Sequence, residues 1–140
     1  MTLSRDEKVE LARHRMAKAA GLLADSETLL RVSSFASSAN RSYYAALSAA
    51  RALLVIRGTD PETHEGVKVL LSKNFIRTGL LSRDASEIFR VLQARRMDSD
   101  YGDFIDIGAT EAADSLEKAR QFVDMAGNAL DTLLKGASEK

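Results

Sequence analysis

The hydrophobic positions of this chain recur every three or four residues over long stretches, which is the spacing of an amphipathic α-helix. These stretches predict helices over residues 3–31, 34–57 and 64–77, a fourth that begins near residue 84, and a fifth over residues 110–135. The short connections between most of them favour antiparallel neighbours. We therefore predict an all-α fold, an up-and-down bundle of four main helices and one shorter helix, in a single domain over residues 1–140.

Particular residues mark the ends of the predicted helices. Ser4 and Glu7 have the spacing of a capping box, in which each side chain binds a backbone N–H that the helix leaves free. Gly58 and Gly79 follow the second and third helices, where glycine can adopt the positive φ of a helix C-terminal cap. Inside the first helix, Gly21 predicts the close approach of a neighbouring element.

The predicted helix over residues 34–57 carries little charge on any side. Its main core face comprises Tyr43, Ala46, Leu47, Ala50, Leu53 and Leu54. Its opposite face consists mostly of small residues, namely Ser37, Arg41, Ala45, Ser48, Ala52 and Val55. A helix of this kind is usually buried on more than one side, so we place it either at the centre of the bundle or across a dimer interface.

Composition narrows the class of protein. Apolar residues make up 45% of the chain, a share typical of a folded domain rather than a disordered segment. The chain has no cysteine, which excludes disulfides, thiolate metal sites and a cysteine nucleophile. The charged first residues lack the apolar stretch of a signal peptide, and no apolar run approaches the roughly 18 residues that span a bilayer. We therefore expect a cytoplasmic protein with no membrane contact.

The net charge of zero conceals an uneven distribution of charge. Residues 31–96 contain eleven Lys or Arg against five Asp or Glu, whereas residues 97–140 contain four against ten. The two stretches could attract each other, within one chain or between the copies of a homodimer. Alternatively, the arginine-rich stretch could form a surface for an anionic partner such as RNA or a nucleotide.

The fourth predicted helix contains the most informative anomaly. Its apolar stripe comprises Ala85, Ile88, Phe89 and Leu92. At 100° per residue, Arg96 lies about 30° from the centre of that stripe and Arg95 about 70° from it. Because a guanidinium cannot lose its charge, an inward arginine needs a carboxylate, carbonyl groups, a phosphate or a wet cleft. Arg96 is therefore either one half of a structural ion pair, with Asp98, Asp100, Asp103 or an acid of the fifth helix, or a phosphate-binding residue in a groove.

The segment after Arg96 is rich in polar groups. Arg96, Asp100 and Tyr101 bring together a cation, an acceptor and a phenol. The aspartates at positions 98, 100, 103 and 106 lack the order and the terminal glutamate of a calcium loop, so we interpret them as a solvated, helix-capping cluster. There is no phosphate-binding glycine loop, His-Glu-x-x-His motif or nucleophile elbow. We expect no metal and no cofactor.

The remaining candidates lie on the second and third predicted helices. Tyr43 falls on the core stripe, with its hydroxyl expected at the edge of the core. Arg41 and Tyr44 lie one turn apart on the other side and could line a groove or stabilise a dimer. His64 is either a cap-region residue or a group that transfers a proton near pH 7, and His14 is interpreted as an exposed bystander.

Taken together, these segments resemble HEPN domains. Residues 37–47 read Ser-Ser-Ala-Asn-Arg-Ser-Tyr-Tyr-Ala-Ala-Leu and are similar to the second helix of that family, followed by Ala50-Arg51-Ala52-Leu53-Leu54 and Gly58. His64-Glu65-Gly66 stands where the family often has His-x-Gly. Thr78-Gly79-Leu80-Leu81 and Arg96-Met97-Asp98-Ser99-Asp100-Tyr101 resemble its later elements. The resemblance covers about residues 35–103.

The resemblance implies a helical bundle that dimerises and works near nucleotides or RNA. HEPN proteins are often encoded with small nucleotidyltransferases as toxin–antitoxin pairs, and many are metal-independent ribonucleases that use an arginine followed by a histidine. Here Arg96 matches that arginine, but Tyr101 stands in place of the histidine. Tyrosine, with a pKa of about 10, is a poor general base at neutral pH. His64 could substitute if the fold brings it near Arg96.

Three functional hypotheses follow. The first is a dimeric HEPN module, with little or no enzymatic activity, that binds a nucleotide or RNA phosphate or a small nucleotidyltransferase partner. Its candidate binding residues are Arg41, Tyr44, Arg95, Arg96, Asp100 and Tyr101. The second is a ribonuclease toxin whose candidate catalytic residues are Arg96, Tyr101 and His64. The third is a purely structural protein-interaction domain, in which Arg96 forms only a structural ion pair.

Overall fold

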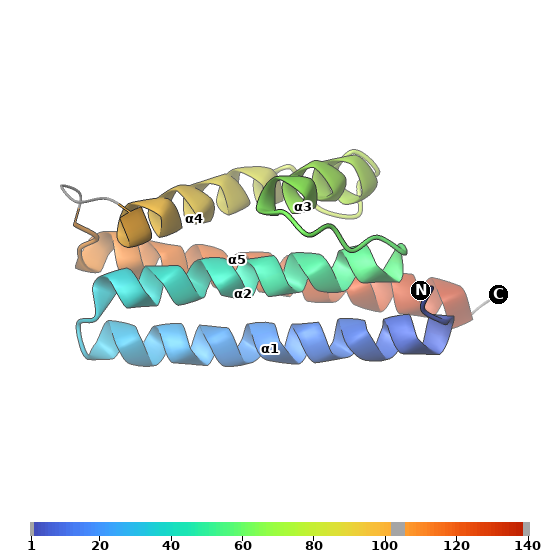
Figure 1. Cartoon of the computed structure of the whole chain (residues 1–140), viewed down its shortest axis with the longest axis horizontal. Coiled ribbons are helices and arrows are strands. Elements are labelled where there is room, and N and C mark those ends of the chain that lie inside the picture. Colours follow the sequence, from blue (N-terminus) through green and yellow to red (C-terminus); the bar gives the residue numbers. More distant parts are fainter. Residues whose placement is uncertain (1, 102–105, 139–140) are drawn as a thin grey trace.

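The computed structural model describes residues 2–101 and 106–138 as a bundle of helices (Figure 1). The elements are α1 (Arg5–Arg31), α2 (Phe35–Ile56), α3 (His64–Leu71), the π-helical turn η1 (Ser72–Ile76), α4 (Asp84–Tyr101) and α5 (Ala109–Ser138). The described part of the chain contains no β-strand. The all-α fold predicted from hydrophobic periodicity is therefore confirmed.

The ends of α1 and α3 are fixed by short side-chain caps. The Ser4 hydroxyl accepts a hydrogen bond from the Glu7 amide, and the Glu7 carboxylate accepts one from the Ser4 amide, at 3.1 and 2.9 Å. The predicted capping box is thus confirmed. At the start of α3, the Thr63 hydroxyl accepts a hydrogen bond from the Gly66 amide at 2.9 Å. Both caps satisfy amides that the first turn of a helix leaves free.

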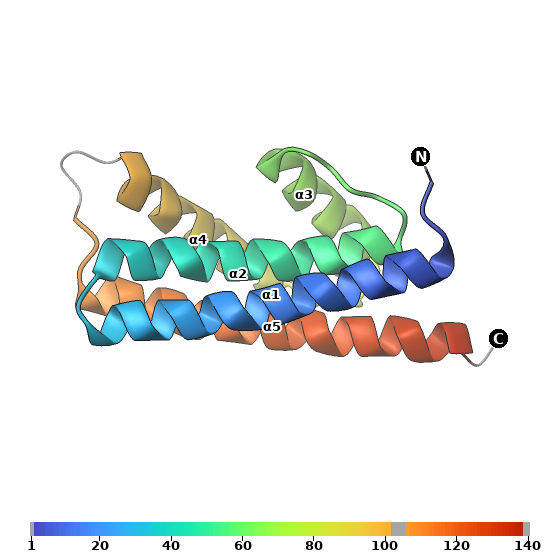
Figure 2. The same cartoon turned by 60° about the horizontal axis from the view of Figure 1, so that its bottom comes forward.

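α2 lies at the centre of the bundle. It packs against α1, α3, α4 and α5, and its buried residues lie on all sides of the helix. α1, α2 and α5 run along the long axis, while α3 and α4 lie on the side of α2 away from α1 (Figures 1 and 2). Of the two positions predicted for this helix, the bundle centre is the one that the structure shows.

Buried hydroxyl groups fix the position of α1 relative to α2. The Ser26 hydroxyl lies 2.8 Å from the Ser42 hydroxyl and donates to the Ser38 carbonyl at 2.9 Å. Two turns further along α2, the Ser48 hydroxyl donates to the Arg15 carbonyl at 2.8 Å. These contacts hold the facing sides of α1 and α2 in one register. They thereby fix the positions of the α1 and α2 side chains that line a cleft described below.

Three details differ from the sequence prediction. Gly21 is exposed, and a Cβ built on it would meet nothing within 4 Å, so the close neighbour predicted there is wrong. The predicted helix over residues 64–77 stops being α-helical at Leu71 and continues as η1. Phe122 of α5, which the sequence reasoning did not single out, is fully buried and lies 5.6 Å from Phe89, measured between ring centroids.

Within the described part of the chain, no helix combines the length and the apolar content that crossing a membrane requires.

Candidate functional site

Arg96 points from α4 into the seam between α4 and α2. Its side chain is only 14% exposed, and its Nη2 donates a hydrogen bond to the Tyr44 hydroxyl at 3.0 Å. Its Nε lies 2.9 Å from an Asp100 carboxylate oxygen. The centre of the guanidinium lies 5.9 and 5.6 Å from the ring centroids of Tyr43 and Tyr44. The helix phase that predicted an inward arginine is therefore correct, and its acidic partner is Asp100.

A chain of polar contacts extends from Arg96 back to α2. The Asn40 amide nitrogen donates to both Asp100 oxygens, at 3.1 and 3.3 Å. Arg41 in turn donates to the Asn40 side-chain oxygen at 2.8 Å. Asn40, Arg41 and Asp100, together with Ser99, line a surface pocket of about 250 Å³. The structure thus joins Arg41, Tyr44, Arg96 and Asp100 of the predicted set, with Asn40 as the link.

His64, the first residue of α3, lies against the same two tyrosines. Its ring centroid is 5.6 Å from that of Tyr43 and 6.3 Å from that of Tyr44. Burial lowers the pKa of the imidazole below its ordinary 6.5, and the positive charges of Arg96 and Arg51 lower it further. The imidazole is therefore neutral at pH 7, with one ring nitrogen able to accept a proton.

The Tyr43 side chain is completely buried, and its hydroxyl has no hydrogen-bond partner among the described residues. Burial raises the pKa of this phenol to about 12, although the charge of Arg96 acts in the opposite direction. The hydroxyl was predicted at the edge of the core, and that prediction is wrong. Its aromatic neighbours explain why: Tyr44, His64 and Phe89 all pack against the Tyr43 ring.

Arg95 is directed away from this cluster, towards α5. Its Nη1 forms an ion pair with Asp114 and lies 3.3 Å from both the Ser115 hydroxyl and the Glu111 carbonyl. The hydrogen bond from Arg95 is the main reason that the pKa of Asp114 is lowered, and Lys118 contributes as well. This ion pair joins the basic and acidic stretches of the chain, in agreement with the docking interpretation of their charges.

Some of the predicted candidates lie outside what the structure describes. These are the side chain of Tyr101 and all of Asp103. Among the described residues, no group of three or more His, Asp or Glu side chains is placed to hold a metal ion.

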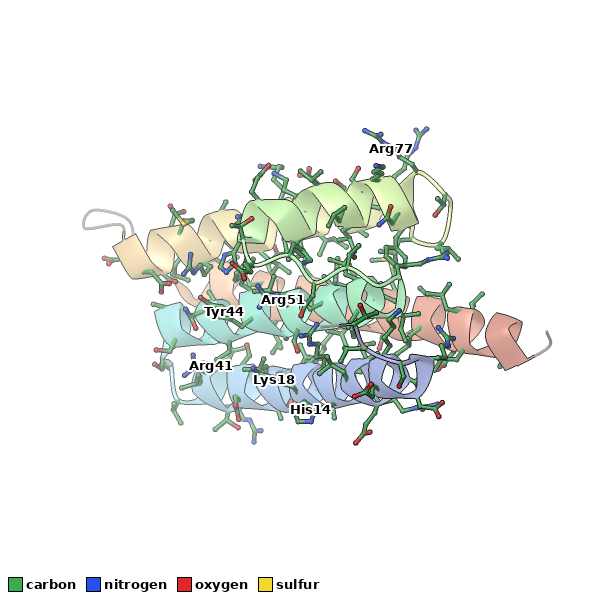
Figure 3. The ribbon with its side chains drawn as sticks, turned by 45° about the vertical axis from the view of Figure 1, so that its right-hand side comes forward. His14, Lys18, Arg41, Tyr44, Arg51 and Arg77 are labelled. Carbon is green, nitrogen blue, oxygen red and sulfur yellow. The ribbon has the colours of Figure 1, made fainter. Side chains whose placement is uncertain are left out.

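The structure also shows a cleft that the sequence reasoning missed. It has a volume of about 350 Å³ and lies between α1, α2 and the start of α3. Its lining includes His14 and Lys18 of α1, Tyr44 and Arg51 of α2, and His64, and Figure 3 shows the first four on one face of the molecule. His14, which was interpreted as a bystander, is thus part of the cleft. The spacing of His14 and Lys18, one helical turn apart, could have indicated it.

Comparisons with known proteins agree with this architecture. A family model described as the HEPN domain matches residues 12–129. A protein of Archaeoglobus fulgidus named UPF0332 protein is 31% identical over 117 residues, covering 84% of this chain and 93% of its own. A protein of Thermotoga maritima with the same name is 27% identical over 119 residues, covering 85% and 90%.

One further relative and one solved structure are informative. A protein of Methanocaldococcus jannaschii, whose name describes it as a candidate toxin, is 29% identical over 124 residues, covering 87% of this chain and 84% of its own. The crystal structure of the protein TT1696 from Thermus thermophilus superposes with a TM-score of 0.72 at 20% identity, covering 84% and 97% of the two chains, and so shares the fold. Since the family model spans most of the residues described above, the chain belongs to the HEPN domain family.

Proposed function

We propose that this chain is a HEPN module that acts as a homodimer in a toxin–antitoxin-like system and binds the phosphate of RNA or of a nucleotide. The observation that carries the proposal is the convergence of Arg96, Tyr44 and His64, from three helices, on one partly buried centre. The name of the Methanocaldococcus relative supports the toxin-like setting. A small nucleotidyltransferase is the partner that the family resemblance implies.

The chemistry of Arg96 suits an exchangeable anion. A guanidinium presents a fork of donors that matches both carboxylate and phosphate oxygens. In the structure that fork faces the Asp100 carboxylate and the Tyr44 hydroxyl. A phosphate has the charge and the acceptor geometry to take the place of Asp100. Arg41 lies close by at the surface, where it donates a hydrogen bond to Asn40, the residue that contacts Asp100.

The direct test measures the binding of a short labelled RNA to the wild-type protein and to Arg96→Ala. We expect the substitution to weaken binding by about tenfold or more, since one lost charge-assisted contact corresponds to at least about 1.4 kcal/mol. Arg77→Ala is the matched control because Arg77 is exposed and lies apart from the other labelled residues in Figure 3. Equal RNA affinity in the two variants would remove Arg96 from the binding site.

A second candidate function is that of a metal-independent ribonuclease. It is favoured by the lowered pKa of His64, on which burial and the positive charges of Arg96 and Arg51 act, and by the packing of its ring against Tyr44, the residue that Arg96 contacts. A neutral imidazole can take the proton from an RNA 2′-hydroxyl, while an arginine stabilises the charge that develops on the phosphate. Incubation with mixed RNA in EDTA tests this candidate. We expect cleavage that His64→Gln abolishes, and RNA that stays intact at high protein concentration contradicts the function.

The dimer and the partner need separate tests. The mass of the protein in solution should correspond to two chains, and a strictly monomeric protein would contradict the proposed homodimer. The third hypothesis, a purely structural interaction domain, predicts that neither RNA nor nucleotide binds and that Arg96→Ala changes only stability. The cytoplasmic location and the single-domain organisation stay predictions.

A further inference from the structure

The cleft between α1, α2 and the start of α3 is elongated. Its lining on α1 extends from Leu11 to Leu22, and its lining on α2 extends from Tyr44 to Arg51. At about 1.5 Å per residue, these stretches correspond to roughly 16 and 10 Å along the two helices. α1 and α2 lie side by side in both views of the bundle (Figures 1 and 2). The cleft therefore follows the pair of helices as a groove.

The side chains that α1 contributes to the cleft change character along its length. Leu11, Arg15, Lys18 and Leu22 follow one another at steps of four, three and four residues. Such steps place side chains on one face of a helix. From one end to the other, α1 thus presents an apolar side chain, two cations and a second apolar side chain. Leu47 of α2 adds to the apolar part of the lining.

The cations of the cleft are only partly neutralised. No Asp or Glu is among the described residues that line it. Arg15 forms a two-point ion pair with Asp60 of the α2–α3 connection, at 3.0 and 3.2 Å. Among the described residues, neither Lys18 nor Arg51 forms an ion pair. A concave surface with uncompensated cations attracts a partner of negative charge.

Arg51 contributes a donor that the described part of the protein does not use. Its Nε is buried and has no hydrogen-bond partner among the described residues. Arg15 donates a hydrogen bond to the Arg51 backbone carbonyl at 3.3 Å, which holds this part of α2 against α1. A buried donor without an acceptor destabilises the structure that contains it. A carboxylate that enters the cleft from outside supplies the missing acceptor in a charge-assisted hydrogen bond.

From the length of the cleft, its order of apolar and basic side chains and the unused donor, we propose that it is the docking site for an amphipathic helix of a protein partner. The docked face of that helix carries acidic side chains between two apolar ones. The acids pair with Lys18 and Arg51, and the apolar side chains pack against Leu11, Leu22 and Leu47. The insertion of one face of a helix into a groove is a recurring mode of recognition between proteins.

The lining suits an acidic helix better than a strand of RNA. RNA carries a phosphate at every nucleotide, so a surface that follows a strand needs cations along its whole length. On α1 the cations lie only in the middle of the cleft, and leucines lie at both ends. A docked helix also covers Tyr44 and His64, which line the cleft as well. The docking goes beyond the proposed function and does not depend on it, because Arg96 takes no part in it.

The test is the fluorescence anisotropy of a labelled synthetic peptide that is titrated with the full chain. The peptide is an alanine-based helix in which two leucines, eleven residues apart, enclose two glutamates, four and seven residues after the first leucine. This spacing matches that of the α1 lining and is the same in either direction. We expect binding that weakens at least tenfold when glutamine replaces both glutamates, and at least tenfold when serine replaces both leucines.

Variants of the protein locate the peptide. Lys18→Glu should weaken binding by tenfold or more, and a peptide with lysines in place of the glutamates should bind Lys18→Glu more tightly than the wild-type protein. Lys18 is exposed, so this change should leave the fold intact. Arg77→Glu is the matched control, because it makes the same change of charge far from the cleft. Arg51→Gln, once its thermal unfolding shows that it is folded, should weaken binding by a similar factor.

The outcomes also distinguish this docking from the proposed function. Equal peptide affinity in Lys18→Glu and Arg77→Glu, or no binding of the peptide at millimolar concentration, overturns the docking. AMP or RNA binding that weakens in Lys18→Glu, in a protein that does not bind the peptide, also overturns it and assigns the cleft to a phosphate. Arg96→Ala should leave the peptide affinity unchanged. Failure of RNA to bind at Arg96 therefore removes the proposed function and leaves the docking in place.

Discussion

The Tyr44 hydroxyl accepts a hydrogen bond from the Arg96 guanidinium at 3.0 Å, and this contact joins two residues that are 52 positions apart in the chain. It ties α2, at the centre of the bundle, to the last turns of α4. The same tyrosine lines the cleft on the α1 side. Tyr44 therefore belongs both to the contacts around Arg96 and to the lining of the cleft, as does His64.

The neighbouring tyrosines should respond differently to loss of the hydroxyl. Tyr44→Phe removes the acceptor for a charged donor, and we expect it to lower the free energy of unfolding by about 1–2 kcal/mol. Tyr43→Phe removes a buried hydroxyl that has no partner among the described residues, so we expect no loss or a gain of up to about 1 kcal/mol. Urea unfolding of the two variants checks both values. A larger loss in Tyr43→Phe than in Tyr44→Phe would contradict this assignment of partners.

Asp100→Asn separates the structural role of Arg96 from its proposed role in binding. The change removes a negative charge that lies 2.9 Å from the guanidinium. We expect the free energy of unfolding to fall by about 1–2 kcal/mol, because the pair is partly shielded from water. If Arg96 binds RNA phosphate, RNA affinity should rise at the same time, because the carboxylate no longer competes. Unchanged RNA affinity together with lower stability would favour a purely structural ion pair.

The lowered pKa of His64 predicts how stability depends on pH. Above the ordinary pKa of 6.5, the imidazole is neutral in both the folded and the unfolded chain and contributes no pH dependence. As the pH falls below that value, the unfolded chain binds a proton that the folded chain still excludes, so stability decreases until the lower pKa of the folded state is reached. Denaturant unfolding from about pH 8 to about pH 5 should show this decrease. It should be smaller in His64→Gln, and an equal decrease in both proteins would contradict the prediction.

Two glycines offer a matched pair of substitutions. Gly21 lies exposed inside α1 with open space around its Cβ position, so Gly21→Ala should stabilise the protein by about 0.5–1 kcal/mol through the higher helix propensity of alanine. Gly58 follows α2 with a φ of 79°, a conformation that costs other residues about 1–2 kcal/mol. Gly58→Ala should therefore destabilise the protein by about that amount. Thermal unfolding checks both signs, and a destabilised Gly21→Ala variant would show a contact that the structure does not contain.

Much of the architecture follows from local pattern. The capping box at Ser4 and the apolar stripe that ends at Leu92 depend on residues a few positions apart, and within a helix such spacings determine direction. The phase of that stripe was sufficient to predict that Arg96 points inward. The family resemblance, which depends on short motifs along residues 35–103, was likewise visible in the sequence and agrees with the HEPN model match.

The sequence by itself thus determined which side of α4 faces the core, because that depends on a fixed rotation per residue. Only the tertiary structure decided which residues meet across helices: that His64 lies against Tyr43 and Tyr44, that Arg95 pairs with Asp114, and that Lys18 and Arg51 line one cleft. Such meetings depend on the angles and offsets at which helices cross, and these are set by the packing of many side chains at once.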